Sequence, residues 1–391
     1  MKTTYPFLAL LFTAGAGIAH GATPDEIGEQ LRDFTVVDAS SPAETPVSLT
    51  SWLDDAGLTF YGYIKADAAL DSGSLSNGNF GRWVNPGGED DSQFNITARQ
   101  TRLGFKAKGP SEAGIESSAR FELDFYSTGS ENSSNPRMRH AYVNLDFVDS
   151  SSSLLFGQTS DVVSPLTTPT INYTILWWSG DIGFRRNQIR YTKTFDLGEG
   201  TSLKAVAAAT RSISGEGEGG PGFQGRVGLT FPGVGDAPTT IGISGHSARE
   251  HDGTASVDSD SLAVDLTVPV ASGTTLKAEF HTGNNLDAYL GGVGQGTTAG
   301  EEIESTGWWL GLSHELGAKS MLNLGYGLDD PEDADLVAGD RSENSTLFAN
   351  VTYALNSATS LGFEVGQHET GYIGGADEEA LRLQVSATFK F

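Results

Sequence analysis

Apolar and polar residues tend to alternate in sixteen runs of roughly 8–14 residues between Leu58 and the carboxy terminus. In the last run, every second residue is apolar from Leu381 to Phe391. Successive side chains of a β-strand point to opposite faces, so this period predicts strands that are apolar on one face only. The predicted strands lie near 58–69, 95–108, 114–127, 137–148, 153–160, 185–195, 201–211, 222–231, 238–247, 259–270, 273–284, 303–315, 318–328, 344–355, 358–368 and 379–391.

The connections between these strands alternate between long polar loops and short turns. The long segments 70–94, 128–136, 248–258, 285–302, 329–343 and 369–378 contrast with turns at Gly109-Pro110, 149–152 and Asn356-Ser357. A soluble β-sandwich produces the same alternation within strands but has no reason to sort its connections. Outer-membrane barrels have an even strand number, long outer loops and short periplasmic turns. We therefore predict an all-β chain forming a 16-stranded antiparallel transmembrane β-barrel.

Composition agrees with a barrel and excludes several other classes of protein. After the amino terminus, no stretch approaches the ~20 apolar residues of a spanning helix. The absence of cysteine excludes disulfides and thiolate sites. The net charge of −26 argues against nucleic-acid binding. No HExxH pattern and no nucleophile–base pair stands out, so we expect neither an enzyme nor a cofactor.

Three segments are expected in the chain. Residues 1–21 have the character of a cleaved signal peptide, with Lys2, an apolar core from Phe7 to Ala19, and small residues at Ala19 and Gly21. A buried amino-terminal helix is the less favoured alternative. Residues 22–57 are rich in Ser, Pro and Thr and are interpreted as a periplasmic extension or linker. Residues 58–391 form the barrel, which we expect in the outer membrane of a Gram-negative cell.

The aromatic connection at 161–184, here called the constriction loop, is the best candidate to fold into the barrel. It contains Asp161, Tyr173, Trp177, Trp178 and Asp181. On the outside of the molecule such a sequence would be an aggregation hazard. An aromatic patch at a subunit interface or facing lipid is the alternative.

Cations are concentrated in one part of the chain. Residues 82–226 carry 15 of the 24 lysines and arginines, whereas residues 227–391 carry 6 basic and 24 acidic groups. An arginine at mid-membrane on the lipid face costs ~2–4 kcal/mol, which favours the lumen. Strand parity directs Arg102, Lys106, Arg120, Arg186 and Arg190 inward. Parity is less binding for Arg99 and Arg137 near strand ends, and it does not support an inward Arg139.

Inward guanidinium groups suit oxyanions, because each stays charged and presents a planar fork to carboxylate or phosphate. The alternative is that these arginines pair with Glu122, Asp124 and Asp146 and only support the wall. The acidic stretches 89–91, 301–304 and 329–335 are expected in outer loops. Solvation of those loops is favoured over Ca²⁺ binding or ion bridges to lipopolysaccharide.

Four motifs in the first half give the chain a recognisable character: ARQTRLGFKAKG (98–109), PRMRHAYVNL (136–145), SLLFGQTSD (153–161) and RRNQIRYTK (185–193). The first resembles a strand motif of general bacterial porins. Together and in this order, over about a hundred residues, they resemble the DcaP-like family of trimeric outer-membrane porins. The second half of the chain is similar only to a generic barrel.

The resemblance implies a homotrimer, contact with outer-membrane lipid and lipopolysaccharide, and uptake of dicarboxylic acids. It places Arg102, Arg120, Arg186 and Arg190 at an arginine-lined constriction, with Arg99, Arg137, Arg139 and Arg185 as further contributors. Family members carry a longer coiled-coil extension, so trimerisation through residues 22–57 is not transferred. The expected function is passive diffusion of small hydrophilic solutes, favouring organic anions. A phosphate-selective or unselective porin, an outer-membrane enzyme and a structural barrel or adhesin are the alternatives.

Overall fold

The structure is a computed structural model that describes residues 57–88, 91–213, 220–235, 237–251, 256–298 and 301–391. The predicted signal peptide and nearly all of the predicted extension lie outside these residues. Among the described residues, no helix has the length and apolar character needed to cross a membrane.

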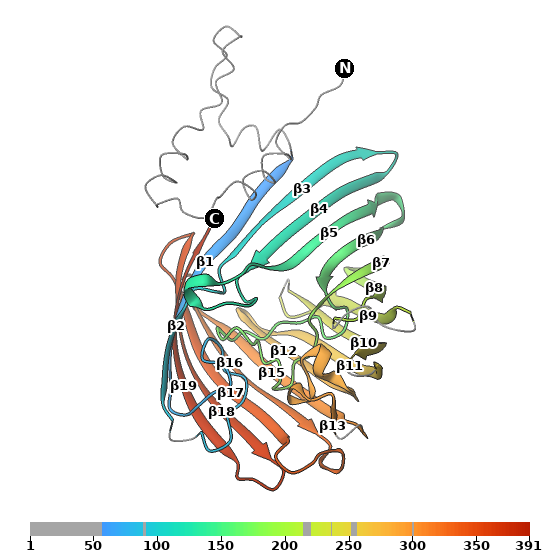
Figure 1. Ribbon diagram of the computed structural model, residues 1–391. Helices are drawn as coiled ribbons and strands as arrows, with labels where there is room; N and C mark the ends of the chain where they lie inside the picture. Colours follow the sequence, from blue (N-terminus) through green and yellow to red (C-terminus); the bar gives the residue numbers. More distant parts are fainter. Residues whose placement is uncertain (1–56, 89–90, 214–219, 236, 252–255, 299–300) are drawn as a thin grey trace, which may run out of the picture. The chain divides into compact units, whose positions relative to one another are not determined.

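The strands follow the chain in simple up-and-down order (Figure 1). They are β1 (Leu58–Asp71), β2 (Gln93–Thr97), β3 (Arg102–Glu112), β4 (Ile115–Asp124), β5 (Arg137–Phe147), β6 (Ser152–Ser160), β7 (Arg185–Gly198), β8 (Thr201–Thr210), β9 (Gly222–Pro232), β10 (Pro238–His251), β11 (Ser256–Ala271), β12 (Thr274–Asn284), β13 (Thr297–Thr298), β14 (Glu301–Glu302), β15 (Glu304–Gly317), β16 (Ser320–Pro331), β17 (Arg341–Ala354), β18 (Thr359–Tyr372) and β19 (Glu378–Lys390). Short 3-10 helices η1 (Glu131–Ser133), η2 (Val148–Ser150), η3 (Leu286–Tyr289), η4 (Gly292–Gly294) and η5 (Asp333–Asp335) lie in the connections.

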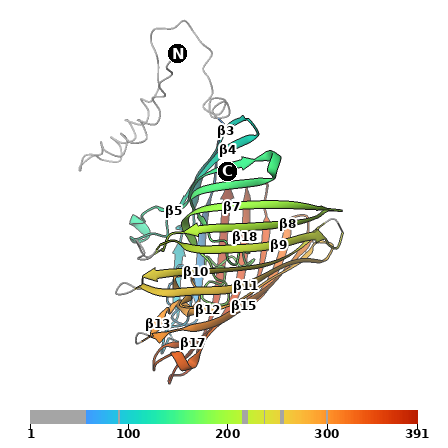
Figure 2. The ribbon, with the colours of Figure 1, turned by 90° about the vertical axis from the view of Figure 1, so that its right-hand side faces the viewer.

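The main sheet closes on itself through antiparallel pairing of β1 with β19. Both β2 and β3 pair with β1, so the seventeen strands of this sheet occupy sixteen positions around the barrel. The β13–β14 hairpin stands apart from the main sheet. Figure 2 shows the wall formed by β7 to β11 from its outer side. The predicted 16-stranded antiparallel barrel is confirmed.

The period of two in the sequence corresponds to the two faces of the wall. Along β19, Leu381, Leu383 and Val385 are 40–47% exposed on the outside, whereas Arg382 and Gln384 are only 2–3% exposed on the inside. The strand ends at Lys390, and the backbone amide and carbonyl of the next residue, Phe391, pair with Gly62 of β1 at 3.2 and 3.1 Å. Apolar side chains therefore face the membrane and polar side chains face the lumen.

The second barrel strand differs from its prediction in two places. It is interrupted at 98–101. There the amide of Thr101 donates a hydrogen bond to the carbonyl of Ala98, and the hydroxyl of Thr101 accepts one from the amide of Lys65. It also continues past the expected turn at Gly109-Pro110 and turns at Ala113-Gly114, both at positive φ. Two-residue hairpin turns favour this geometry, and glycine adopts it without strain. Pro110 lies in a bulge of the strand pairing, where no ladder amide is required.

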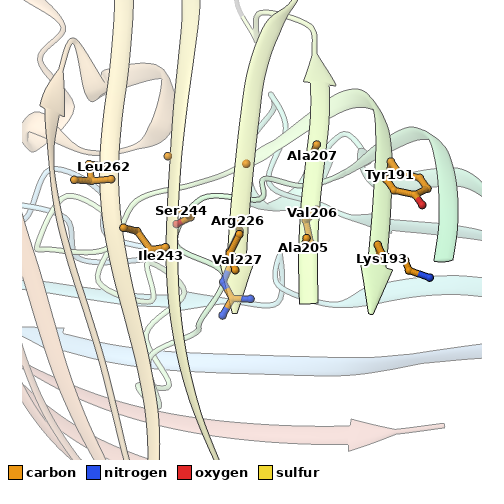
Figure 3. A pocket seen from close by; sticks show the side chains of 12 residues that line it. Tyr191, Lys193, Ala205, Val206, Ala207, Arg226, Val227, Ile243, Ser244 and Leu262 are labelled. Carbon is orange, nitrogen blue, oxygen red and sulfur yellow. The ribbon is translucent and has the colours of Figure 1, made fainter. Parts of the chain in front are cut away.

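Among larger exposed side chains such as Val227 and Ile243, the outer face of β8 to β10 carries the small residues Ala205, Ala207, Gly225 and Gly245. They leave a shallow groove of about 330 Å³ between Tyr191 and Leu262 (Figure 3). The groove is mainly apolar and faces away from the lumen, so it is not part of a solute path.

Three loops fold into the lumen. They are the constriction loop and two others, which we name by their order among the long connections of the chain. These are the first loop (72–88), after β1, and the sixth loop (285–298), after β12. Leu286, Tyr289 and Val293 of the sixth loop and Val84 of the first loop are completely buried. Leu286 and Tyr289 pack with Val163 and Ile182 of the constriction loop. Only the inward fold of the constriction loop was predicted from the sequence.

Candidate functional site: an arginine-lined constriction

Strand side chains hold the constriction loop against the lumen wall. The amide of Leu166 donates to Glu279 Oε1 of β12 at 2.9 Å, and the amide of Ile171 donates to Glu364 Oε2 of β18 at 2.8 Å. Ser179 shares a hydrogen bond of 3.1 Å with Thr346 of β17. The predicted inward fold is therefore confirmed, and the aromatic segment does not face lipid.

Glycines let this loop approach the wall closely. A Cβ atom on Gly180 would lie 2.1 Å from the carbonyl oxygen of Trp308, and one on Gly327 would lie 2.1 Å from the carbonyl oxygen of Ser179. Gly180 also has a φ of +101°, which suits glycine. No larger residue fits at either point unless the loop moves away from β15 and β16.

The other two inward loops brace the constriction loop. The amide of Trp178 donates to the carbonyl of Leu290 at 2.9 Å, and the amide of Gly183 donates to that of Tyr289 at 2.7 Å. On the opposite side, Phe80 of the first loop packs on Tyr173 and Trp178, with ring centroids 5.3 and 6.5 Å apart. The constriction is therefore a composite of three loops.

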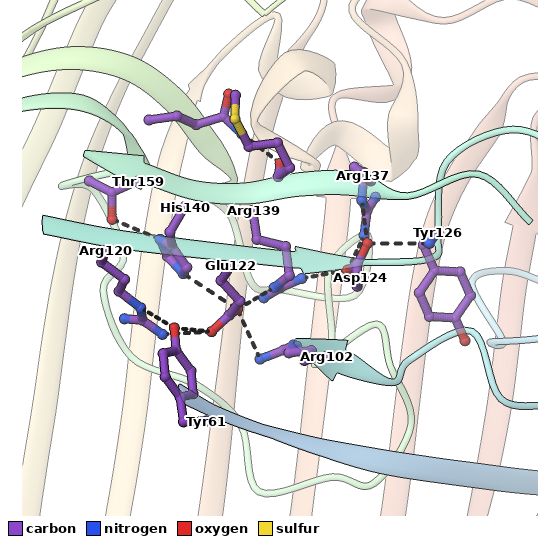
Figure 4. A network of polar contacts seen from close by, with 12 residues as sticks. Tyr61, Arg102, Arg120, Glu122, Asp124, Tyr126, Arg137, Arg139, His140 and Thr159 are labelled. Carbon is purple, nitrogen blue, oxygen red and sulfur yellow. Dashed lines mark hydrogen bonds and ion pairs between the residues drawn. The ribbon is translucent and has the colours of Figure 1, made fainter. Parts of the chain in front are cut away.

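Several arginines near this loop are ion-paired (Figure 4). Arg120 contacts Glu122 at 2.7 Å, and Arg137 contacts Asp124 at 2.7 Å. Arg139 contacts both carboxylates at 2.8 Å. The carboxylates of Glu122 and Asp124 therefore neutralise much of the charge of these three arginines, which support the wall through their ion pairs. Asp146 instead accepts a hydrogen bond from Asn144.

Arg139 points inward although strand parity predicts otherwise. The pairing of β4 with β5 shifts register here, with Glu122 opposite His140 and Leu123 opposite Met138. Arg139 is therefore the extra residue of a bulge, and both Arg139 and His140 are buried. A bulge re-aims the side chains that follow it, and its position depends on the partner strand.

The other three arginines of this region are held less closely by carboxylates. Arg102 is 3.9 Å from Glu122 at its nearest approach, and its buried Nε has no hydrogen-bond partner. Arg185 lies over the ring of Phe184 at 4.1 Å, and its Nη2 also has no partner. Arg190 donates to Gln188 Oε1 at 2.8 Å and to the carbonyl of Ser160. Within the described part of the chain, neither Arg185 nor Arg190 forms an ion pair.

A cavity of about 390 Å³ lies between the constriction loop and this part of the wall. Its charged lining comprises Arg102, Arg139, Arg185, Arg190, Asp161 and Asp181, and Tyr173, Trp177 and Phe184 contribute aromatic surface. Asp161 is bound by the guanidinium of Arg186, which leaves the arginines as the dominant charge of the cavity.

The remaining predicted site residues lie elsewhere. The side chain of Arg186 is completely buried between Asp161, Glu250 and the ring of Tyr289, so it braces the wall and does not line the cavity. Arg99 donates to the carbonyls of Phe125 and Ser127 near the outer strand ends. Lys106 lies 5.2 Å from the ring centroid of Tyr61 and is exposed. Trp178 faces the first loop and packs on Trp83.

Asp181 is the most deeply buried carboxyl group of the constriction loop. It is 1% exposed, and neither of its oxygens has a hydrogen-bond partner among the described residues. Burial and the nearby charge of Glu279 hold the pKa of Asp181 well above its ordinary value. The neutral acid is therefore the favoured form at this position.

Sequence reasoning missed the residues of the first loop and Lys65. Lys65 is buried and donates to Gln100 Oε1 at 2.5 Å and to the carbonyl of Ile171 at 2.9 Å. The available signal for the first loop was the run Phe80-Gly81-Arg82-Trp83, which is aromatic within an otherwise polar connection. The described residues contain no group of three or more His, Cys, Asp or Glu side chains arranged to hold a metal ion.

A closed barrel of this kind, with its lumen narrowed by inward loops, defines an outer-membrane channel. The model of the Gram-negative porin family matches residues 8–371, and the chain belongs to that family. It is an outer-membrane channel for passive diffusion.

Solved porin structures share the fold at low sequence identity. The outer membrane channel DcaP of Acinetobacter baumannii aligns with a TM-score of 0.71 and 18% identity, covering 85% of this chain and 97% of that one. The anion-selective porin from Comamonas acidovorans aligns with a TM-score of 0.60 and 14% identity, covering 85% of this chain and 99% of that one. The trimer form of OmpT of Vibrio cholerae aligns with a TM-score of 0.56 and 11% identity, covering 85% of this chain and 99% of that one. No curated protein sequence matches the chain.

Proposed function

We propose that this porin favours small organic anions, dicarboxylates in particular. The observation that carries the proposal is the cavity at the constriction, where Arg185 and Arg190 present guanidinium groups without an ion pair among the described residues, and Arg102 approaches Glu122 only to 3.9 Å. A passing carboxylate exchanges part of its hydration for these donors, which are already held in place. Exposure of the cavity to solvent keeps binding weak enough for release.

A porin with little charge preference, or one that prefers phosphate, is the second candidate. The observation that favours weak selectivity is the net charge of −18 on residues 227–391. Acidic outer loops repel anions, but salt screens exposed charges beyond about 8 Å at physiological ionic strength. The arginines at the constriction act at contact distance, so we expect them to dominate.

Planar-bilayer recording of the full-length protein tests the proposal. We expect an anion-selective reversal potential in a salt gradient, and current interruptions by succinate at lower concentration than by phosphate or acetate. Cation selectivity of the wild-type channel would overturn the anion preference. Absence of conductance would contradict an open channel.

Substitutions test the residues. Each unpaired charge contributes about 1 kcal/mol at 4 Å in water, or roughly fivefold in relative permeability. Arg185→Gln with Arg190→Gln removes two such charges and should therefore lower the anion-to-cation permeability ratio by about 25-fold. The matched control is Arg226→Gln with Asp265→Asn, which removes an ion pair of 2.6 Å in the wall without changing net charge. Equal selectivity in the two variants would show that the assignment of these arginines is wrong.

We also propose that the channel is a homotrimer in contact with lipid and lipopolysaccharide, and that residues 1–21 are a cleaved signal peptide preceding an extension at 22–57. One similar structure is described as a trimer form. Native-mass measurement in detergent tests the trimer, and amino-terminal sequencing of the mature protein tests the cleavage.

A further inference from the structure

Besides Arg185 and Arg190, two further arginines that form no ion pair with any described residue lie on the loop side of the constriction. Arg82 belongs to the first loop, and Arg341 is the first residue of β17. The guanidinium carbon of each arginine lies 4.2 Å from the ring centroid of Trp83. That of Arg82 also lies 5.3 Å from the ring of Trp178 in the constriction loop. Two cations therefore share one tryptophan beside the constriction loop.

The backbone around this group is held firmly in place. The carbonyl of Arg82 accepts from the Asn344 side chain at 2.9 Å, and the same amide group donates to the carbonyl of Trp178 at 2.6 Å. The amide of Val84 donates to Thr370 Oγ1 at 2.9 Å. Hydrogen bonds to β17 and β18, and through Asn344 to the constriction loop, thus fix the position of Arg82, which does not lie on a free loop tip.

Each guanidinium uses only part of its hydrogen-bonding capacity. Arg82 donates through Nε to the Ser76 hydroxyl at 3.1 Å and through Nη2 to the Ser76 carbonyl at 3.4 Å. Arg341 donates through Nε to the carbonyl of Val293 at 2.9 Å. Among the residues that the structure describes, neither forms an ion pair, in contrast to Arg120, Arg137 and Arg139. Both side chains are partly exposed, so the remaining donors are accessible.

The positive charge of Arg341 acts on Arg82. Burial and the charge of Arg341 lower the pKa of Arg82, although it remains a cation at neutral pH. An anion placed against both groups relieves this repulsion and accepts charge-assisted hydrogen bonds from the unused donors. A dianion relieves more of it than a monoanion.

We propose that Arg82, Trp83 and Arg341 form an outer binding site that loads small organic dianions before they reach the constriction. The inference rests on the proposed anion preference and adds a second site to it. Trp83 packs edge-on against Trp178 with centroids 6.1 Å apart, so the outer site adjoins the constriction loop. In a chain whose second half is strongly acidic, this site raises the local concentration of anions on the loop side.

The test is the rate at which succinate interrupts current through single channels, with succinate added to one side at a time. Clefts lined by one sign of charge raise association rates by roughly 10-fold or more. Arg82→Gln with Arg341→Gln should therefore lower the association rate from the loop side by about threefold or more. Addition from the turn side should be affected much less. Arg82→Lys with Arg341→Lys keeps the charges but not the planar fork, and we expect it to retain part of the effect.

Arg249→Gln is the matched control, because Arg249 is an exposed arginine on β10, paired at 3.3 Å with the exposed Asp258. A loop-side rate in the Arg82/Arg341 variant equal to that of the Arg249 variant would overturn the outer site. If the double variant fails to assemble, the two single glutamine variants make the same comparison, each with a smaller expected decrease. Failure of the anion preference itself appears separately, as a wild-type channel without anion selectivity.

Discussion

Glu364 is the side chain whose removal should reveal most about how the constriction loop is held. It is 8% exposed on β18 and accepts hydrogen bonds from four groups. They are Thr170 Oγ1 at 2.8 Å to both oxygens, the amides of Ile171 and Asn172 at 2.8 and 3.3 Å, and Asn350 Nδ2 at 2.8 Å. Glu364→Ala removes the acceptor for all of them.

The expected magnitude follows from the donors that belong to the loop. A hydrogen bond to a charged group contributes about 1.5–3 kcal/mol, and Thr170, Ile171 and Asn172 each lose one. The loss at Asn172 is the smallest, because its amide keeps the Thr170 hydroxyl as an acceptor at 3.1 Å. Water in the lumen offsets part of this lost free energy, because it accepts hydrogen bonds from the donors that become exposed. A net loss of about 2 kcal/mol would raise the population of a displaced loop roughly 30-fold. Lys65 still holds the carbonyl of Ile171, so the displacement should be local.

Single-channel recording measures this population directly. We expect Glu364→Ala to raise open-channel noise and mean conductance, with an unchanged β-sheet signal in circular dichroism. Glu364→Gln keeps one acceptor oxygen and is the matched control, with an intermediate effect. Conductance and noise identical to wild type in the alanine variant would refute the view that this carboxylate anchors the loop.

Two further perturbations act on the same loop. Gly327→Ala should displace the loop, because the added Cβ would lie 2.1 Å from the carbonyl oxygen of Ser179. Gly225→Ala is the control, because the atom nearest to its added Cβ would be 3.8 Å away. We expect a larger conductance only in the Gly327 variant, and equal conductance in the two variants would contradict the close approach. The raised pKa of Asp181 means that the folded loop favours the neutral acid, so its stability is complete below the ordinary carboxyl value and falls as pH rises through the raised pKa. Current noise should therefore increase with pH in the wild type and not in Asp181→Asn, and a pH response that persists in this variant would assign the effect to another group.

Much of the barrel was predictable because its signal is local. The face of a strand residue depends on the parity of its neighbours, and the alternation from Leu381 to Phe391 is visible without knowledge of any partner strand. The inward loop was predictable for a related reason, since Trp177 and Trp178 are unsuited to an exposed connection. The interruption at 98–101 and the turn at Ala113-Gly114 were missed, because backbone geometry at a single residue decides them.

The candidate site was only partly accessible from the sequence. Parity correctly placed Arg102, Arg120 and Arg190 in the lumen, but it could not separate Arg120, which is ion-paired, from Arg190, which is not. Arg186 shares the parity of Arg190, yet it is enclosed by Asp161 and Glu250. Carboxylates from a loop and from a distant strand make that difference, and no local pattern reports them.

The sequence by itself thus determined the barrel, its strand number and the loop that narrows it, because alternation and loop length act over a few neighbouring residues. Tertiary structure alone decided which arginines remain without a carboxylate, because that depends on contacts between strands and loops far apart in the chain. It also turned Arg139 inward through a bulge, and brought Arg82 and Arg341 to one tryptophan across 258 intervening positions.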